Sequence, residues 1–257
     1  MMWVRVLRSP VVVFFALVFA LSLPFWAVGE ASGLQLPAGL PISALQVVVP
    51  AVAAALLIRL TGGSVRRFLR GVFDAKKIPL VWYLPALLLM PAITLLSHGL
   101  AGHPLPQPPI VSVLVYFALY VVAACAEEAG WTAYATGPVQ RWCGALGAGV
   151  LIGAVWAAWH VVPYFQLHGP VWVLWQSLFT VAARVVIVWL HNNTGRSTFV
   201  AVLFHAMINV CYSVSADAGA YDPMPVGAVT LGAAALIALV WNPRTLAQLR
   251  FHAPRGR

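Results

Sequence analysis

Three short motifs hold the side chains best suited to chemistry: an adjacent pair of glutamates, a histidine, and a histidine followed by an asparagine four residues later. These residues are Glu127, Glu128, His160, His205 and Asn209. Two neighbouring carboxylates cannot both stay ionised at low cost in a low dielectric. One member of the pair is therefore expected to keep its proton, which suits a general base or a general acid.

The two histidine motifs allow more than one interpretation. His205 and Asn209 are four residues apart, so in a helix both side chains lie on one face. There they can donate hydrogen bonds to a developing oxyanion or act as ligands, and the alternative is a polar patch between packed helices. A single histidine in an apolar segment, such as His160, is more often a structural donor than a ligand.

The composition indicates what surrounds these motifs. The chain has 257 residues, of which 62% are hydrophobic and 8% are charged, whereas a soluble domain carries about 25% charged residues. Lipid must therefore be the solvent for most of the chain. The net charge of +9 then indicates cytoplasmic loops of a membrane protein, and we expect no nucleic-acid partner.

Eight apolar stretches are each close to the ~20 residues that a membrane-spanning helix needs. We predict an all-α polytopic membrane protein with eight transmembrane helices, and we treat residues 1–257 as a single membrane domain. The predicted spans are Val11–Gly29, Ile42–Leu60, Leu80–His98, Ile110–Thr136, Leu146–Tyr164, Val171–Leu190, Phe199–Ala216 and Val226–Trp241.

The charges of the loops support this count independently. With eight spans, fourteen of the fifteen basic residues fall on one face, and the opposite loops contain only acidic charges, Glu30, Asp217 and Asp222. Basic loops face the cytoplasm, so both termini are predicted to be cytoplasmic, in a multi-pass protein of the bacterial cytoplasmic membrane. The basic residues of that face are Arg5, Arg8, Arg59, Arg66, Arg67, Arg70, Lys76, Lys77, Arg141, Arg196, Arg244, Arg250, Arg255 and Arg257.

Two smaller features are read from the same pattern. The first span ends in Ala27-Val28-Gly29, which resembles a signal-peptide cleavage site, although its apolar run is long for one and favours a first membrane helix. Cys125, Cys143 and Cys211 provide neither a disulfide framework nor a paired zinc spacing, and we interpret them as small buried apolar residues.

Helix geometry links the three motifs. Glu128 lies 13 residues before the cytoplasmic Arg141, and His160 lies 19 residues after it. His205 and Asn209 follow another cytoplasmic arginine by 9 and 13 residues. At ~1.5 Å per residue, all four lie roughly 13–28 Å from the cytoplasmic charges, so they are expected to converge on one cavity within the bilayer.

The motifs, their order and the eight-helix layout resemble the CAAX prenyl protease type II family, also called the CPBP or Abi family of intramembrane glutamate proteases. The resemblance covers residues 110–216, which it marks as the catalytic core. It implies that Glu127 activates a water molecule with help from His160, that His205 and Asn209 stabilise the oxyanion, and that Glu128 braces the site.

One position departs from the family pattern. The family has an arginine four residues after the second glutamate, and this chain has Thr132 there. Arg184 is the only basic residue in the interior of a predicted span, since Arg59 lies one residue from the end of its span, so we hypothesise that Arg184 pairs with Glu127 or Glu128. The alternative is that Arg184 extends to the lipid headgroups.

The resemblance implies an intramembrane endopeptidase that cuts a peptide or lipidated peptide near the cytoplasmic leaflet. One alternative is an enzyme of the same fold acting on an isoprenoid or other lipid, and another is a non-catalytic immunity or partner protein. No cofactor is required by the favoured mechanism, although glutamates and histidines together are also able to bind a divalent metal. The expected partners are the peptide substrate, an isoprenoid ligand in the lipid alternative, and the bilayer.

Overall fold

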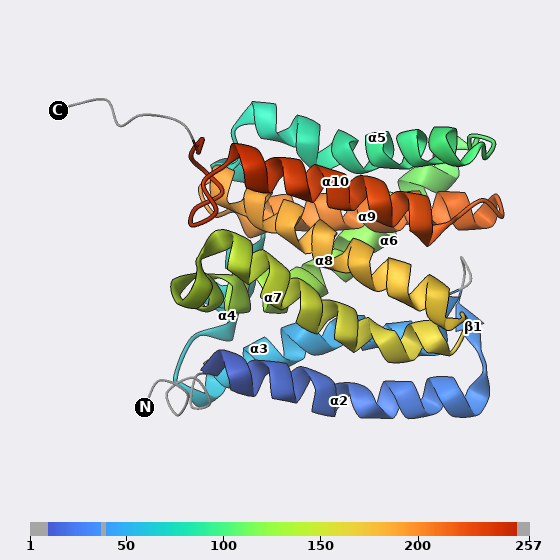
Figure 1. The fold of residues 1–257 in the computed structure, drawn as a ribbon. Coiled ribbons are helices and arrows are strands. Elements are labelled where there is room, and N and C mark those ends of the chain that lie inside the picture. The colour runs from blue at the N-terminus through green and yellow to red at the C-terminus, as the bar shows by residue number, and fades with distance from the viewer. Residues whose placement is uncertain (1–9, 37–39, 251–257) are drawn as a thin grey trace.

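A computed structural model describes residues 10–36 and 40–250 of the chain, and almost all of them are helical. This confirms the all-α prediction. The long helices lie side by side, with α2 and α5 at opposite edges of the view in Figure 1. They are α2 (Pro10–Ser32), α3 (Val49–Leu60), α5 (Tyr83–Ala101), α6 (Ile110–Glu128), α7 (Gly137–Phe165), α8 (Pro170–Asn193), α9 (Thr198–Asp217) and α10 (Pro223–Val240).

Short elements connect these helices. The two-residue strands β1 (Gln35–Leu36) and β2 (Leu40–Pro41) pair in antiparallel fashion and lead into the 3₁₀ helix η2 (Ile42–Val48). The short helix α4 (Val65–Val72) lies between α3 and α5 with the 3₁₀ turns η3 (Ala75–Lys77) and η4 (Leu80–Trp82), and the π-helix η5 (Ala129–Thr136) joins α6 to α7.

The structure has seven helical stretches long and apolar enough to cross a membrane in its described part, against the eight that the sequence predicts. The difference lies in one stretch, Ile110–Phe165, whose 56 residues contain two of the predicted spans. Gly144 interrupts this stretch with φ 73° and ψ 179°, a conformation that favours glycine. The chain is therefore a multi-pass integral membrane protein, and the count differs only because α6, η5 and α7 are counted as one stretch despite the kink at Gly144.

The loops assigned to the basic face lie together at one end of the bundle. The Ala145 amide donates to the Arg244 carbonyl, and Ser197 Oγ donates to Asp74 at 2.6 Å. The start of α2 and the end of α10 lie on the same side of the view in Figure 1. Arg5, Arg8, Arg255 and Arg257 lie outside the described residues, and the cytoplasmic orientation of this face stays a prediction.

The loops of the opposite face also contact one another. Ser43 Oγ donates to Gln166 Oε1 at 2.6 Å, and Gln166 Nε2 donates to the Trp26 carbonyl at 3.0 Å. On the far side of the bundle, Ser97 Oγ donates to the Pro225 carbonyl at 3.3 Å. The alternation of loops that the charges predict is therefore present in the described part of the chain.

Two glycines set the distance between α7 and α8. A Cβ atom added at Gly149 would lie 3.0 Å from Val185 Cα, and one at Gly153 would lie 2.9 Å from Val181 Cα and 3.1 Å from Arg184 Cβ. Small residues at a helix interface let two backbones approach closely. This close packing places Arg184 in the interior of the protein.

The first helix belongs to the same packed unit. Trp159 Nε1 on α7 donates to Ser22 Oγ on α2 at 2.7 Å, and the rings of Phe14 and Trp131 pack edge to face. The cysteines are free. The prediction that they are buried is confirmed for Cys211, whereas Cys125 is half-buried and Cys143 is exposed near the end that carries the basic loops.

Candidate active site

The two glutamates lie at the point where α6 changes into the π-helix η5. Glu127 is 5% exposed and Glu128 is fully buried. A π-helical turn is wider than an α-helical one and often marks a functional site. Here it begins at Ala129, directly after the pair, and Gly130 lets this turn pack against Pro50 of α3.

Glu128 is held from three sides. Arg184 on α8 donates to both of its oxygens, from Nη1 at 2.7 Å and from Nη2 at 2.9 Å, and both side chains are 0% exposed. Thr132 Oγ1 donates to Glu128 Oε2 at 2.5 Å and accepts from Arg184 Nη1 at 3.3 Å. The hypothesis that Arg184 pairs with one of the glutamates is confirmed, and the partner is Glu128.

His205 on α9 completes the surroundings of Glu128. Its Nδ1 lies 2.8 Å from Glu128 Oε1. A carboxylate paired with arginine only accepts hydrogen bonds, so His205 Nδ1 carries the proton and donates. This leaves Nε2 of the same ring directed at Glu127, with 3.9 Å between Nε2 and Glu127 Oε1.

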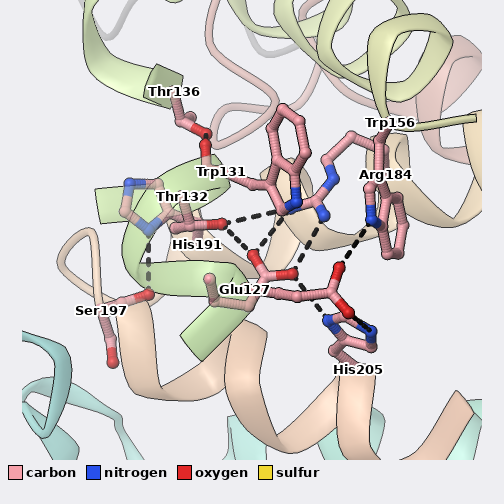
Figure 2. Close-up of polar contacts among 10 residues, drawn as sticks. Glu127, Trp131, Thr132, Thr136, Trp156, Arg184, His191, Ser197 and His205 are labelled. Atoms are coloured by element: carbon pink, nitrogen blue, oxygen red, sulfur yellow. Dashed lines mark hydrogen bonds and ion pairs between the residues drawn. The ribbon is translucent and has the colours of Figure 1, made fainter. Parts of the chain in front are cut away.

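Glu127 accepts a hydrogen bond from the indole of Trp156 on α7, with 2.8 Å between Nε1 and Oε2. The Trp156 ring in turn lies under the guanidinium of Arg184, 4.2 Å from its centre, and 5.0 Å from the His205 ring. Figure 2 shows Glu127 between Trp156 and His205, with Arg184 beside the indole. Trp156 thus joins the two glutamates into one cluster.

His160 lies one helical turn after Trp156. Its Nδ1 is 2.9 Å from the Trp156 carbonyl oxygen, which can only accept, so Nδ1 carries the proton. The other ring nitrogen, Nε2, is therefore an acceptor with a free lone pair. The ring is packed between Trp159 at 4.7 Å and Tyr164 at 5.4 Å, which limits its rotation.

A cavity of about 250 Å³ brings the predicted site residues together. Glu127, His160 and Asn209 line it directly, whereas Glu128 and His205 do not and lie behind Glu127. The convergence of the three motifs that depth along the helices predicts is therefore present. The five residues form two layers, and only the layer of Glu127, His160 and Asn209 faces the cavity.

The described side chains do not form a metal site of the usual kind. No three Asp, Glu, His or Cys side chains in the described part of the chain are grouped as ligands. Both oxygens of Glu128 already accept hydrogen bonds from Arg184, Thr132 or His205. The donors that remain near the cavity, Glu127 and His160, are fewer than the three protein ligands of a catalytic zinc.

Comparison with known proteins finds similarity over the segment that contains these residues. A family profile described as "Type II CAAX prenyl endopeptidase Rce1-like" matches residues 109–211, the segment that carries all three motifs. This segment of the chain is therefore similar to that family. A curated relative, CAAX prenyl protease 2 of Methanococcus maripaludis, is 27% identical over 192 residues, covering 66% of this chain and 70% of the relative.

Two residues without a predicted role lie at the site. Trp156 lies one helical turn before His160, and its indole donates to Glu127. Thr132 marked a departure from the family, yet it donates to the same carboxylate as Arg184. Neither contact has a signal in the sequence beyond the one-turn spacing of Glu128 and Thr132.

Proposed function

We propose that the chain is an intramembrane peptidase in which Glu127 activates a water molecule for attack on a peptide carbonyl. The observation that carries this proposal is the division of labour between the two glutamates. Glu128 is neutralised by a bidentate arginine, whereas Glu127 lines the cavity and accepts only the Trp156 hydrogen bond among the described residues. A carboxylate held in this way keeps one oxygen for water.

The first step is attack by water. Glu127 takes a proton from the water molecule while the oxygen of that water forms a bond to the substrate carbonyl carbon. His160 supports this step because its Nε2 lone pair accepts the second hydrogen of the same water, and its Nδ1 is fixed on the Trp156 carbonyl. Both groups line one cavity on rigid helices, so the water is oriented before attack.

The resulting oxyanion needs hydrogen-bond donors. Asn209 supplies its side-chain amide from the cavity wall. His205 does not line the cavity; its Nδ1 donates to Glu128 and its Nε2 is directed at Glu127, so it positions the base from behind. Arg184 pairs with Glu128 in the same layer, which lowers the cost of burying that carboxylate.

The second step returns the proton. Glu127, now a carboxylic acid, donates its proton to the nitrogen of the scissile amide, the carbon–nitrogen bond breaks, and the oxyanion collapses to a carboxylic acid. The products are two peptides, and Glu127 is again ionised. The name of the relative, CAAX prenyl protease 2, makes a prenylated peptide with a CAAX-type C-terminus the first substrate to test.

The decisive experiment is cleavage of a farnesylated CAAX-type peptide in ¹⁸O-water by the purified protein in lipid nanodiscs. We expect ¹⁸O in the new C-terminal carboxylate. Glu127→Gln is expected to slow cleavage by roughly 10²–10⁴-fold, the usual contribution of a general base. Glu30→Gln is the matched control, because Glu30 is exposed and lies outside the cavity.

Comparison of peptides and lipids in cells that express wild type or Glu127→Gln covers other substrates. A peptide that accumulates with Glu127→Gln supports the peptidase. A change confined to a prenyl or terpenoid product would instead support the lipid enzyme. Full biological activity of a folded Glu127→Gln variant would leave only the non-catalytic partner.

A further inference from the structure

The cavity above Glu127 leads toward one end of the bundle. Its lining continues from His160 to Leu167 and His168, where α7 ends, and to Trp172, where α8 begins. It also includes Leu36 and Leu40 of the short strands, and Tyr221 between α9 and α10. All of these residues belong to the end of the bundle opposite the basic loops.

The other end of the site is closed. A layer of fully buried side chains lies between Glu127 and the basic loops, and none of these side chains lines the cavity. Arg184, Trp131 and Glu128 are each 0% exposed in this layer, and Leu190 is 0% exposed below them. Among the described residues, the cavity therefore extends from the site toward the end of the bundle that holds His168.

The distribution of charge orients this passage. The basic residues at the closed end include Arg59, Lys77, Arg141, Arg196 and Arg244. All the charged residues in the loops at the open end are acidic. At the closed end, α4 is amphipathic, with Arg66, Arg67 and Arg70 exposed and Val72 buried. Such basic elements face the cytoplasmic, anionic leaflet.

We propose that the peptidase site opens to the non-cytoplasmic side of the membrane and takes an uncharged, apolar peptide segment from that side. This inference rests on the proposed function and sharpens it. It replaces the expectation of cleavage near the cytoplasmic leaflet, which came from the resemblance and not from the shape of the cavity.

The chemistry of the lining defines the substrate class. Apolar side chains such as Met90, Phe179 and Ile208 alternate with neutral hydrogen-bonding groups such as Gln176 and Tyr212. No lysine or arginine lines the cavity in the described part of the chain, so a free C-terminal carboxylate finds no cation there. A volume of about 250 Å³ is below the usual range for ligand pockets, so the cavity encloses only a small part of a peptide substrate.

The orientation is tested by thiol labelling, which needs no activity. Single cysteines are placed at Leu167, at the mouth, and at Leu100, which is 71% exposed on the same face. Cys143 is the internal marker of the opposite face. We expect a membrane-impermeant maleimide to label L167C and L100C in intact spheroplasts and Cys143 only after disruption; the reverse pattern would overturn the proposed orientation.

The passage is tested by blocking it. In a background with Cys125, Cys143 and Cys211 replaced by alanine, a bulky maleimide on L167C is expected to remove most cleavage of a neutral apolar peptide, compared with the unlabelled variant. The same adduct on L100C is expected to leave cleavage unchanged. Equal cleavage by labelled and unlabelled L167C would overturn the passage, while loss of activity in Glu127→Gln would still support the peptidase.

Discussion

Arg184 on α8 and Glu128 on α6 form a fully buried, bidentate ion pair, with nitrogen–oxygen distances of 2.7 and 2.9 Å. The family pattern places an arginine at the position of Thr132, one turn after Glu128 on the same helix. In this chain the cation comes from another helix, and Thr132 fills the vacated position with a hydroxyl that donates to the same carboxylate. Glu128 therefore has a cationic partner although position 132 carries no charge.

The first prediction concerns this exchange. Arg184→Leu leaves a buried carboxylate without its cation, and breaking a buried pair costs about 3–5 kcal/mol. We expect a lower thermal unfolding temperature and loss of cleavage. Adding Thr132→Arg to Arg184→Leu returns a guanidinium to Glu128 and is expected to recover part of both quantities.

Arg141→Leu is the control for removing an arginine as such, because Arg141 is exposed at the end of the bundle. It is expected to behave like wild type in both assays. If Arg184→Leu unfolded at the wild-type temperature and cleaved at the wild-type rate, the pair would have no role in holding Glu128.

This pairing shows what the sequence was able to predict. Arg184 is the only basic residue in the interior of a predicted span, because Arg59 lies at the end of its span. An intramembrane charge needs a partner, so the candidates were few. Depth along the helices also predicted that Glu128, His160, His205 and Asn209 would meet. Both inferences depend on one-dimensional quantities, charge and rise per residue, which the sequence contains.

Other features depend on how side chains pack, and the sequence does not contain them. Helical spacing did not predict that the chain would widen into a π-helix at Ala129, or that Asn209 would face the cavity while His205 lies behind it. The end at which the cavity opens follows from the buried layer around Trp131 and Leu190. The motifs lie at a similar depth from either membrane face, so their depth alone does not show at which end the cavity opens.

The second prediction isolates the indole of Trp156. Trp156→Phe keeps an aromatic ring against Arg184 and His205 but removes the N–H that donates to Glu127. A hydrogen bond to a charged group contributes about 1.5–3 kcal/mol, so the cleavage rate should fall roughly ten- to hundredfold with little change in unfolding temperature. Trp142→Phe, on an exposed tryptophan, should not slow cleavage; an equal rate in Trp156→Phe would remove the indole from the mechanism.

The third prediction concerns metal. Because the described cavity residues do not supply three ligands, we expect cleavage to persist after dialysis against EDTA and in 1,10-phenanthroline. The peptide assay in nanodiscs measures this directly. Activity that disappears on chelation and returns with Zn²⁺, but not with Mg²⁺, would show that a bound metal performs the role in water activation that is assigned to His160.

The fourth prediction concerns Asp74, which holds the start of α9 and therefore the helix of His205 and Asn209. Burial alone would raise the pKa of Asp74, but hydrogen bonds from Ser197 Oγ and the Phe199 amide, with Lys77 nearby, lower it below its ordinary value. A carboxyl with a lowered pKa stabilises the folded state above its ordinary pKa of about 3.9, and this contribution is lost as pH falls through the folded value. Wild type should therefore exceed Asp74→Asn in unfolding temperature at neutral pH, and the difference should shrink only below about pH 4.

Ser197→Ala removes one of these donors. Its unfolding temperature should also lie below that of wild type at neutral pH, by a smaller amount, and this difference should likewise shrink in acid. A difference between wild type and Asp74→Asn that did not depend on pH would mean that Asp74 acts without its charge.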